Sequence, residues 1–303
     1  MRGVLRDFGY ELDDAGECIK PRYWLLLDEQ RVWLDRHDGS LGFTFTSLGV
    51  SRCRHCDEEI AKVYGGGYCY DCFRSLARCD LCVLSPDRCH WHLGTCREAD
   101  WGREFCMQPH VVYLANSSGP KVGLTRHNRC PARWVDQGAR SAMIIAEFAS
   151  RRTAGYAEAH LKQWVADTTD WRRLVSGNTR LVDLWSLFAQ LRPKCGDLAA
   201  LAPDFVDDEE RSAMRWLGSQ DIAQVSIEYP YSSFAPARIA FRSGTVAGTQ
   251  FRANFNGIIG GYFLFDAGAV NVGDLLTRQV ELEIGDAHSA EQLTDQQDQL
   301  SLF

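Results

Sequence analysis

Four cysteines between positions 53 and 72 have the spacing of a metal-binding site. The stretches "CRHC" and "CYDC" place Cys53, Cys56, Cys69 and Cys72 as C-x2-C-x12-C-x2-C. Each C-x-x-C turn presents two thiolates on one side of a tight loop, and four thiolates complete a tetrahedral zinc site. The sequence therefore predicts a structural zinc ion here, with a redox-active pair or an iron-sulfur cluster as the alternatives.

A second group of possible metal ligands follows directly. It consists of Cys79, Cys82, Cys89, His90, His92, Cys96 and Cys106. We predict a second structural zinc ion held by Cys79, Cys82, Cys96 and Cys106, with Cys89 or His92 as possible replacements for the last two. Because a module of residues 51–107 is too small to form much of a core, the metal is expected to supply its folding free energy.

The charge of the chain is unevenly distributed. The 303 residues carry a net charge of -7, yet residues 107–180 hold 11 basic and five acidic side chains. No apolar run approaches the ~20 residues that a membrane span requires, and the start "MRGVLRDFGYELDD" does not resemble a signal peptide. We therefore expect a cytoplasmic protein that does not bind membranes, with a central segment suited to a polyanion.

The central segment has the pattern of a small mixed unit. "HVVYLANSSGPKVGLTR" predicts two short strands joined by a turn, and "CPARWVDQGA" opens a helix near Pro131. "SAMIIAEFA" is a short apolar run typical of a buried strand, and "TAGYAEAHLKQWVADTTDW" has apolar residues at helical spacing. The predicted order is strand, strand, helix, strand, helix.

This order and its residues resemble the core of the GIY-YIG nucleases. "VVY" with Tyr113 resembles the first signature, and "KVGLT" with Lys121 and Gly123 resembles the lysine-containing form of the second. Arg133 in "PARW" and Glu158 in "GYAEAHL" fall where the helical arginine and the metal-binding glutamate are expected. In the tyrosine-containing form a second tyrosine stands at position 121, so the lysine changes what positions or activates the attacking water.

The wider layout adds a second resemblance. Paired cysteine turns followed by "GTCREADWG", "KVGLTR" and "RWVDQGA" resemble an uncharacterised bacterial family with a zinc module before such a core. That likeness supports the architecture more than the chemistry.

The nuclease resemblance implies phosphodiester hydrolysis. Glu158 would hold one Mg2+ or Mn2+ ion, Arg133 would stabilise charge developing on the phosphoryl oxygens, and Tyr113 would position or deprotonate water. Lys121 would offer a further cation to the phosphate. Taken singly, each of these residues has an ordinary alternative in packing, a solvated helix face or surface stacking.

The remaining arginines of the central segment are candidates for phosphate positioning, with a solvated helix face as the alternative. They are Arg126, Arg129, Arg151, Arg152, Arg172 and Arg173.

The flanking segments complete the predicted α+β organisation. Aromatic and β-branched stretches predict a discontinuous β domain from residues 1–50 plus 222–285. Residues 51–107 form the zinc-binding module, 108–180 the small GIY-YIG-like α/β core, 181–221 a helical connector and 286–303 a flexible tail.

The last five residues, "QLSLF", resemble the peptide by which bacterial polymerases and repair proteins dock on the β sliding clamp. Gln299 would form a hydrogen bond at one subsite, while Leu300, Leu302 and Phe303 fill apolar ones. A terminal strand or helix packed on its own domain is the alternative.

Together these observations predict a clamp-recruited, Mg2+-dependent, structure-specific DNA endonuclease of replication or repair. A zinc-stabilised nucleic-acid-binding adaptor without cleavage is the alternative from another class, and an RNA-acting enzyme is a third.

Overall fold

The structure, a computed structural model, describes residues 1–14, 18–239 and 246–289. Its contacts divide the chain into two units, each interrupted in sequence. Unit 1 comprises Met1–Phe73, Trp171–Asn178 and Glu228–Phe303, and unit 2 comprises Arg74–Asp170 and Thr179–Ile227. The fold is mixed α/β, with a mostly antiparallel arrangement of strands. In the described part of the chain, every helix is too short or too polar to cross a membrane.

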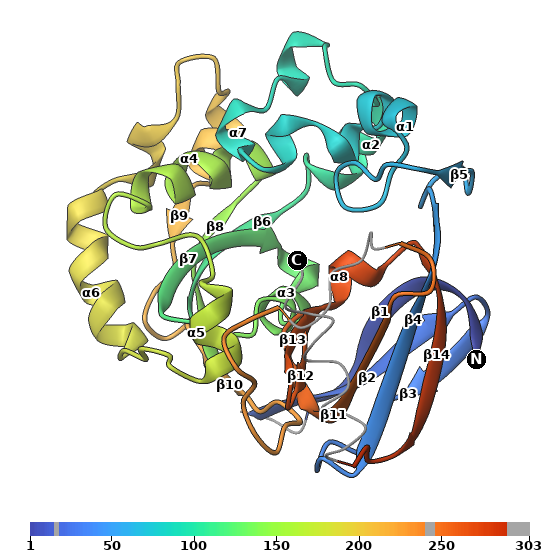
Figure 1. Ribbon diagram of the computed structural model, residues 1–303. Coiled ribbons are helices and arrows are strands. Elements are labelled where there is room, and N and C mark those ends of the chain that lie inside the picture. The colour runs from blue at the N-terminus through green and yellow to red at the C-terminus, as the bar shows by residue number, and fades with distance from the viewer. Residues whose placement is uncertain (15–17, 240–245, 290–303) are drawn as a thin grey trace. The chain divides into compact units, whose positions relative to one another are not determined.

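Unit 1 is built on antiparallel strands from both ends of the chain (Figure 1). Their order is β13-β12-β11-β4-β14-β1-β2, with β3 beside β2 and β5 beside β4. The strands are β1 (Arg2–Asp14), β2 (Cys18–Leu27), β3 (Gln30–Trp33), β4 (Leu41–Arg52), β5 (Glu59–Ile60), β11 (Gln250–Ile259), β12 (Tyr262–Phe265), β13 (Gly268–Asn271) and β14 (Arg278–Asp286). The short helices α5 (Trp171–Ser176) and α8 (Val272–Leu275) also belong to this unit.

An aromatic core explains why these distant strands pair. Phe45 of β4 stands opposite Phe251 of β11 and Leu282 of β14, and all three side chains are buried. Phe43 and Phe255 pack ring to ring, with centroids 4.9 Å apart. Because side chains alternate between the two faces of a strand, residues two apart bury the same face and fix the register.

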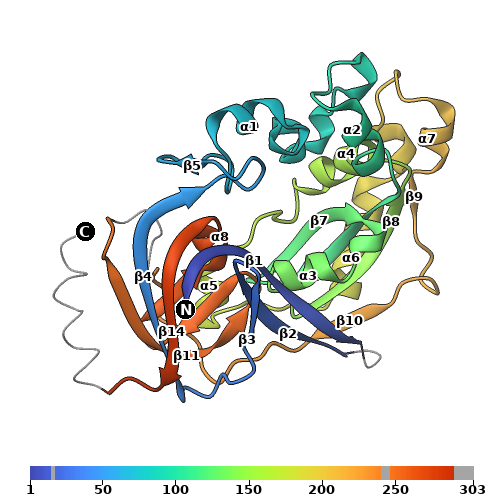
Figure 2. The same cartoon turned by 90° about the vertical axis from the view of Figure 1, so that its right-hand side faces the viewer.

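Unit 2 combines a smaller antiparallel sheet with helices. The strand order is β10 (Gln224–Ile227), β8 (Ser141–Phe148), β6 (His110–Asn116) and β7 (Pro120–Arg126), and β9 (Arg215–Trp216) also pairs with β8. Its helices are α2 (Ala99–Phe105), α3 (Ala132–Asp136), α4 (Arg151–Leu161), α6 (Leu184–Cys195) and α7 (Asp208–Ser212). Both α4 and α6 pack on the sheet, as Figure 2 shows.

Helix α4 begins and packs as its sequence dictates. Ser150 and Thr153 form a reciprocal capping box at its N-terminus, which satisfies backbone N–H groups that the first turn leaves unpaired. Ala154, Ala157 and Leu161 are fully buried and recur at helical spacing, so this face lies in the core of unit 2. The order β6, β7, α3, β8, α4 places Glu158 in a helix beyond the third strand.

The units differ from the five segments expected from sequence. Cys53, Cys56, Cys69 and Cys72 lie in unit 1, whereas Cys79 to Cys106 lie in unit 2. Residues 181–221 belong to the core of unit 2, where Leu184 and Phe188 are buried against the sheet and α4. Strand β10 pairs with β8 of the same unit, so residues 224–227 fall outside the terminal β domain.

Candidate metal centre and phosphate-binding site

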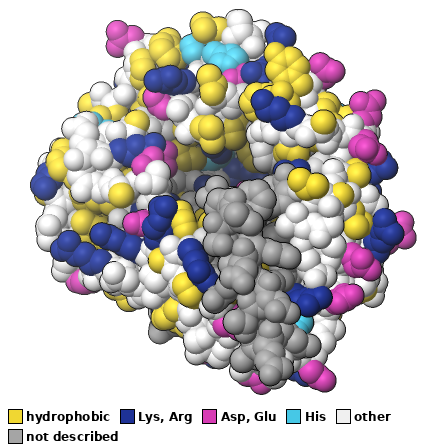
Figure 3. Space-filling model, viewed as in Figure 1, with side chains coloured by type: hydrophobic (Ala, Val, Ile, Leu, Met, Phe, Trp, Pro, Cys, Tyr) yellow, Lys and Arg dark blue, Asp and Glu magenta, His cyan; other side chains and the backbone are white. Residues whose placement is uncertain are grey.

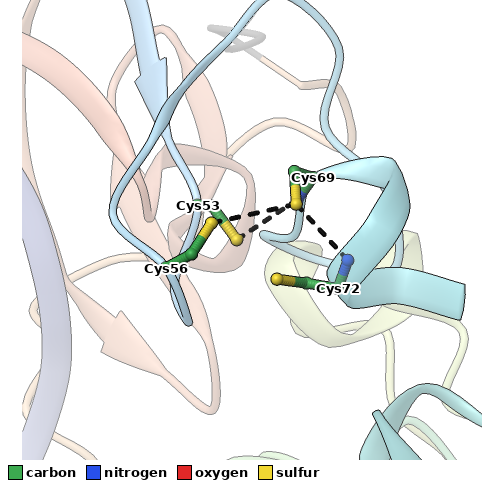
Figure 4. A group of neighbouring side chains, drawn as sticks. All are labelled: Cys53, Cys56, Cys69 and Cys72. Atoms are coloured by element: carbon green, nitrogen blue, oxygen red, sulfur yellow. Dashed lines mark hydrogen bonds between the residues drawn. The ribbon is translucent and has the colours of Figure 1, made fainter. Parts of the chain in front are cut away.

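Cys53, Cys56, Cys69 and Cys72 form a cluster in unit 1 that could hold a metal ion (Figure 4). Their sulfur atoms all lie within 4.8 Å of one another, and the sulfurs of Cys56 and Cys69 are 3.9 Å apart. Cys53 directly follows β4, Cys69 precedes α1 (Tyr70–Ser75), and Cys72 lies in the first turn of that helix. The structure therefore confirms that these thiols can hold a metal ion, and four thiolates suit zinc.

Local backbone geometry prepares these thiols for a metal ion. Residues 65–67 are glycines with φ of 52°, 78° and 139°, a conformation that lets the chain turn sharply between the two cysteine pairs. The N–H of Cys69 donates to Cys53 Sγ at 3.3 Å. Burial opposes ionisation of Cys53, but backbone N–H groups outweigh it and lower the pKa of this thiol to about 6. A thiolate is the form that binds zinc.

Tyr113 and Gly123 face each other across the β6–β7 hairpin of unit 2. They are directly opposite in the register, and the tyrosine ring lies over the glycine. A Cβ atom at position 123 would come within 2.5 Å of Tyr113 Oη, so a side chain there would displace the ring. Tyr113 is fully buried. The glycine of "KVG" is therefore required by the close approach of the tyrosine.

Gln137 joins Tyr113 to Arg133. When its amide oxygen faces Arg133, it accepts from Nε at 3.2 Å and Nη2 at 3.1 Å, and its amide nitrogen lies 2.7 Å from Tyr113 Oη. Burial raises the pKa of Tyr113 well above its usual range, while Arg133 opposes and Glu158 reinforces this rise. Tyr113 is thus neutral at physiological pH. The Arg133 side chain is exposed, so its guanidinium faces solvent.

Lys121 is a buried cation beside the same residues. Its side chain is 3% exposed, and Nζ donates to Thr169 Oγ1 at 3.3 Å. Desolvation lowers the pKa of Lys121 to about 8, and Arg133 adds to this, while Asp167 and Glu158 oppose it. The segment that covers it is held by a hydrogen bond from Val122 N to Ala166 O of 2.8 Å. The amine therefore titrates close to physiological pH.

Glu158 lies on α4 within reach of the same charges. Its side chain is 12% exposed, and burial raises the pKa of its carboxyl. Lys162 Nζ is 3.7 Å from Glu158 Oε2 and 2.9 Å from Asp167 Oδ2, so one ammonium group contacts both carboxylates. Lys121 also acts on this carboxyl electrostatically. Unit 2 thus brings Tyr113, Lys121, Arg133 and Glu158 into one interacting group.

The arginines expected to position phosphates occupy different environments. Arg126 stacks on Phe105 at 4.0 Å, and exposed Arg129 pairs with Asp136 at 3.7 Å. Arg172 and Arg173 are exposed on α5 of unit 1. On the face drawn in Figure 3, basic side chains form several separate groups among acidic and uncharged ones.

Two arginines at the start of α4 differ from that expectation. Arg152 is 4% exposed and pairs with Glu210 at 2.5 Å. Its guanidinium is therefore buried in an ion pair and is not accessible to a phosphate. Arg151 is partly buried and donates from Nη2 to Val83 O at 2.6 Å.

The second cysteine group surrounds a small cavity in unit 2. Of the expected ligands, Cys82, Cys96 and Cys106 line it, together with Cys89. Cys79 is not among the lining residues. His92 instead stacks on Phe205, with ring centroids 4.4 Å apart.

Sequence reasoning did not identify Gln137, nor Asp167 and Thr169 near Lys121. Gln137 follows Arg133 by four residues, the spacing at which helical side chains meet, and this signal could have identified it. Thr169 and Asp167 carried no comparable signal, because they approach Lys121 only through the folding of a later segment.

The fold and the cluster define a mixed α/β protein with a cysteine cluster that could hold a metal ion. A family model described as a protein of unknown function (DUF2797) matches residues 40–280. Because this match covers most of the chain, the protein belongs to the DUF2797 family. Neither a curated protein nor a solved structure matches the chain.

Proposed function

We propose that the protein is a metal-dependent DNA endonuclease of the GIY-YIG type, acting in repair or replication. The observation that carries this proposal is the grouping of Tyr113, Lys121, Arg133 and Glu158 in unit 2 around the β6–β7 hairpin and α4. Two cations with a carboxylate between antiparallel strands and a helix suit a phosphodiester, whose negative charge increases in the transition state.

The donor set fits a divalent cation. Mg2+ is commonly held by one or two carboxylates together with substrate phosphates, and Glu158 with nearby Asp167 can provide them. Both carboxylates contact Lys162, which would have to give way. When bound, the ion would neutralise phosphoryl oxygens and polarise the scissile bond.

The other side chains of the group have separate roles in binding and positioning the phosphate. Exposed Arg133 binds the phosphoryl oxygens, and Gln137 holds its guanidinium in place from behind. Because buried Tyr113 stays neutral, its role is to anchor Gln137, rather than to deprotonate water as its family position implies. Lys121, with its pKa of about 8, is a cation at neutral pH and attracts the phosphate.

Recruitment by the sliding clamp is the second part of the proposal. The peptide "QLSLF" at Gln299–Phe303 lies outside the described residues, so its support is the sequence resemblance alone. A clamp tether would raise the local concentration of the enzyme on replicating DNA.

A non-catalytic nucleic-acid-binding adaptor is the second candidate. The specific observation in its favour is Lys162, whose ammonium group occupies the space between the carboxylates of Glu158 and Asp167. If that contact persists on DNA, a divalent cation cannot bind and the site would bind phosphates without cleaving.

The decisive experiment compares wild type with Glu158→Gln on labelled branched, nicked, mismatched and crosslinked DNA, with and without Mg2+. We expect wild type to cleave at least one substrate only with the ion, and the variant to lose cleavage while keeping its DNA affinity, because the cationic surface is unchanged. Glu147→Gln is the matched control, since Glu147 lies on β8 in a surface ion pair with Arg215. Equal cleavage by wild type and Glu158→Gln would refute the catalytic assignment. DNA binding without cleavage by wild type would favour the adaptor.

A further inference from the structure

The cysteine cavity of unit 2 has a lining that suits a metal ion, although its four thiols lie less close together than those of the unit 1 cluster. Its volume is about 10 Å³, close to the smallest space that admits one water-sized body. Separate short turns bring the four thiols to it. Cys82 lies in η2 (Leu81–Val83), Cys89 directly follows η3 (Pro86–Arg88), Cys96 precedes α2 and Cys106 follows it.

The surrounding segment has only a small apolar interior, to which Leu76 and Ala77 contribute. Leu81, Leu84 and Leu93 are 71%, 80% and 66% exposed, whereas Cys89 and Cys106 are 9% and 6% exposed. Three leucines that could form a hydrophobic core therefore face solvent, whereas two of the thiols are buried. A segment built in this way needs another source of folding free energy, and a coordinated metal ion is the usual one.

We propose that Cys82, Cys89, Cys96 and Cys106 hold a second, structural zinc ion, and that Cys79 is not a ligand. Four thiolates complete a closed tetrahedral site. This assignment replaces Cys79 with Cys89 in the set expected from C-x-x-C spacing, because Cys89 lines the cavity and Cys79 does not.

His90 and Asp80 are the competing ligands. Asp80, Cys82 and His90 offer atoms within 4.8 Å of one another. However, Asp80 already pairs with Arg97 Nε at 2.8 Å, and its Oδ2 lies 3.6 Å from His90 Nε2, so these two groups contact each other. We therefore assign them to the surroundings of the ion, where Arg97 balances the carboxylate.

The site fastens the helix that carries Glu158. Arg151 N donates to Cys106 O at 2.7 Å, and Arg151 Nη2 donates to Val83 O at 2.6 Å, so residues at or beside two ligands hold the first turn of α4. One turn later Gly155 packs so closely on η3 that a Cβ atom would lie 2.6 Å from Asp87 N. Loss of the ion would release this end of α4. An effect of that release on DNA cleavage is expected only on the basis of the proposed function.

Metal content and stability test the site independently of activity. Elemental analysis of the full chain should find about two zinc ions in wild type and about one in Cys106→Ser and Cys89→Ser. Cys79→Ser and His90→Asn should keep both. Cys69→Ser, in the unit 1 cluster, is the comparator that loses the other ion. Thermal unfolding of Cys106→Ser should begin at a lower temperature than that of wild type.

Cobalt substitution of the native chain avoids variants that fail to fold. Because charge-transfer absorption grows with the number of thiolates bound, two four-cysteine sites should give about twice the intensity of one. One zinc ion in wild type, two in Cys106→Ser, or loss of an ion in Cys79→Ser or His90→Asn would overturn the assignment. Two zinc ions in a wild type that cleaves no DNA would support this site and refute the nuclease proposal.

Discussion

Replacing the buried Lys121 with methionine is expected to stabilise unit 2 while weakening its binding to DNA. Methionine has a similar length and no charge, so it can fill the same space. The ordinary lysine pKa of 10.5 falls to about 8 in the folded protein. The folded state therefore disfavours the charged amine, and Lys121→Met removes that cost.

The magnitude follows from the two pKa values. One pKa unit corresponds to roughly 1.4 kcal/mol, so at pH 7 the buried charge costs about 3 kcal/mol. Methionine also loses the hydrogen bond to Thr169, worth roughly 1 kcal/mol. The net gain in unfolding free energy is about 2 kcal/mol, which should raise the melting temperature by roughly 4–8 °C.

The pH dependence of stability tests whether burial of the charged Lys121 amine is the cause. Below pH 8 both folded and unfolded wild type carry the charged amine, and the full cost applies. Between about 8 and 10.5 the unfolded chain keeps the proton that the folded protein has released, so wild-type stability rises with pH. The advantage of Lys121→Met should therefore be largest near pH 7 and shrink toward pH 10.

Urea unfolding at pH 7 and pH 9.5 measures this difference, and DNA affinity at low salt measures the loss of function. Wild-type affinity should fall as pH rises through 8, and the variant should show no such fall. Lys162→Met is the control, because Lys162 is partly exposed and paired with Asp167, so its loss should not stabilise. A Lys121→Met protein that is less stable than wild type at pH 7, or an advantage unchanged at pH 9.5, would refute the reasoning.

Two further predictions concern the hairpin and the tail. Gly123→Ala should lower stability by about 1–3 kcal/mol and impair cleavage, because its Cβ would displace the buried Tyr113 ring, and thermal unfolding with DNA cleavage assays would reveal it. A Gly123→Ala protein as stable and active as wild type would contradict the packing of Tyr113. Deleting Gln299–Phe303 should abolish binding to the sliding clamp in a pull-down and leave the melting temperature and cleavage of short DNA unchanged. A several-degree drop in melting temperature would show that these side chains belong to the core.

Short-range spacing determined the features that sequence reasoning predicted well. Two C-x-x-C turns and the glycines between them are enough to bring Cys53, Cys56, Cys69 and Cys72 together, because each turn is a local structure. The turn after Asn116 sets the register of β6 and β7, and that register places Tyr113 opposite Gly123. In both cases the partners are separated by at most about twenty residues, so the chain has few other ways to join them.

Only the tertiary structure decided which polar groups are buried and with whom. Arg152 looks like a surface cation in sequence, but Glu210, 58 residues later, neutralises it in the interior. Lys121 acquires its low pKa because residues 166–169 fold over it. The second cysteine group was ambiguous for the same reason. Several thiols at irregular spacing can be combined in many ways, and the packing of the short turns against α4 selects the four that share one cavity.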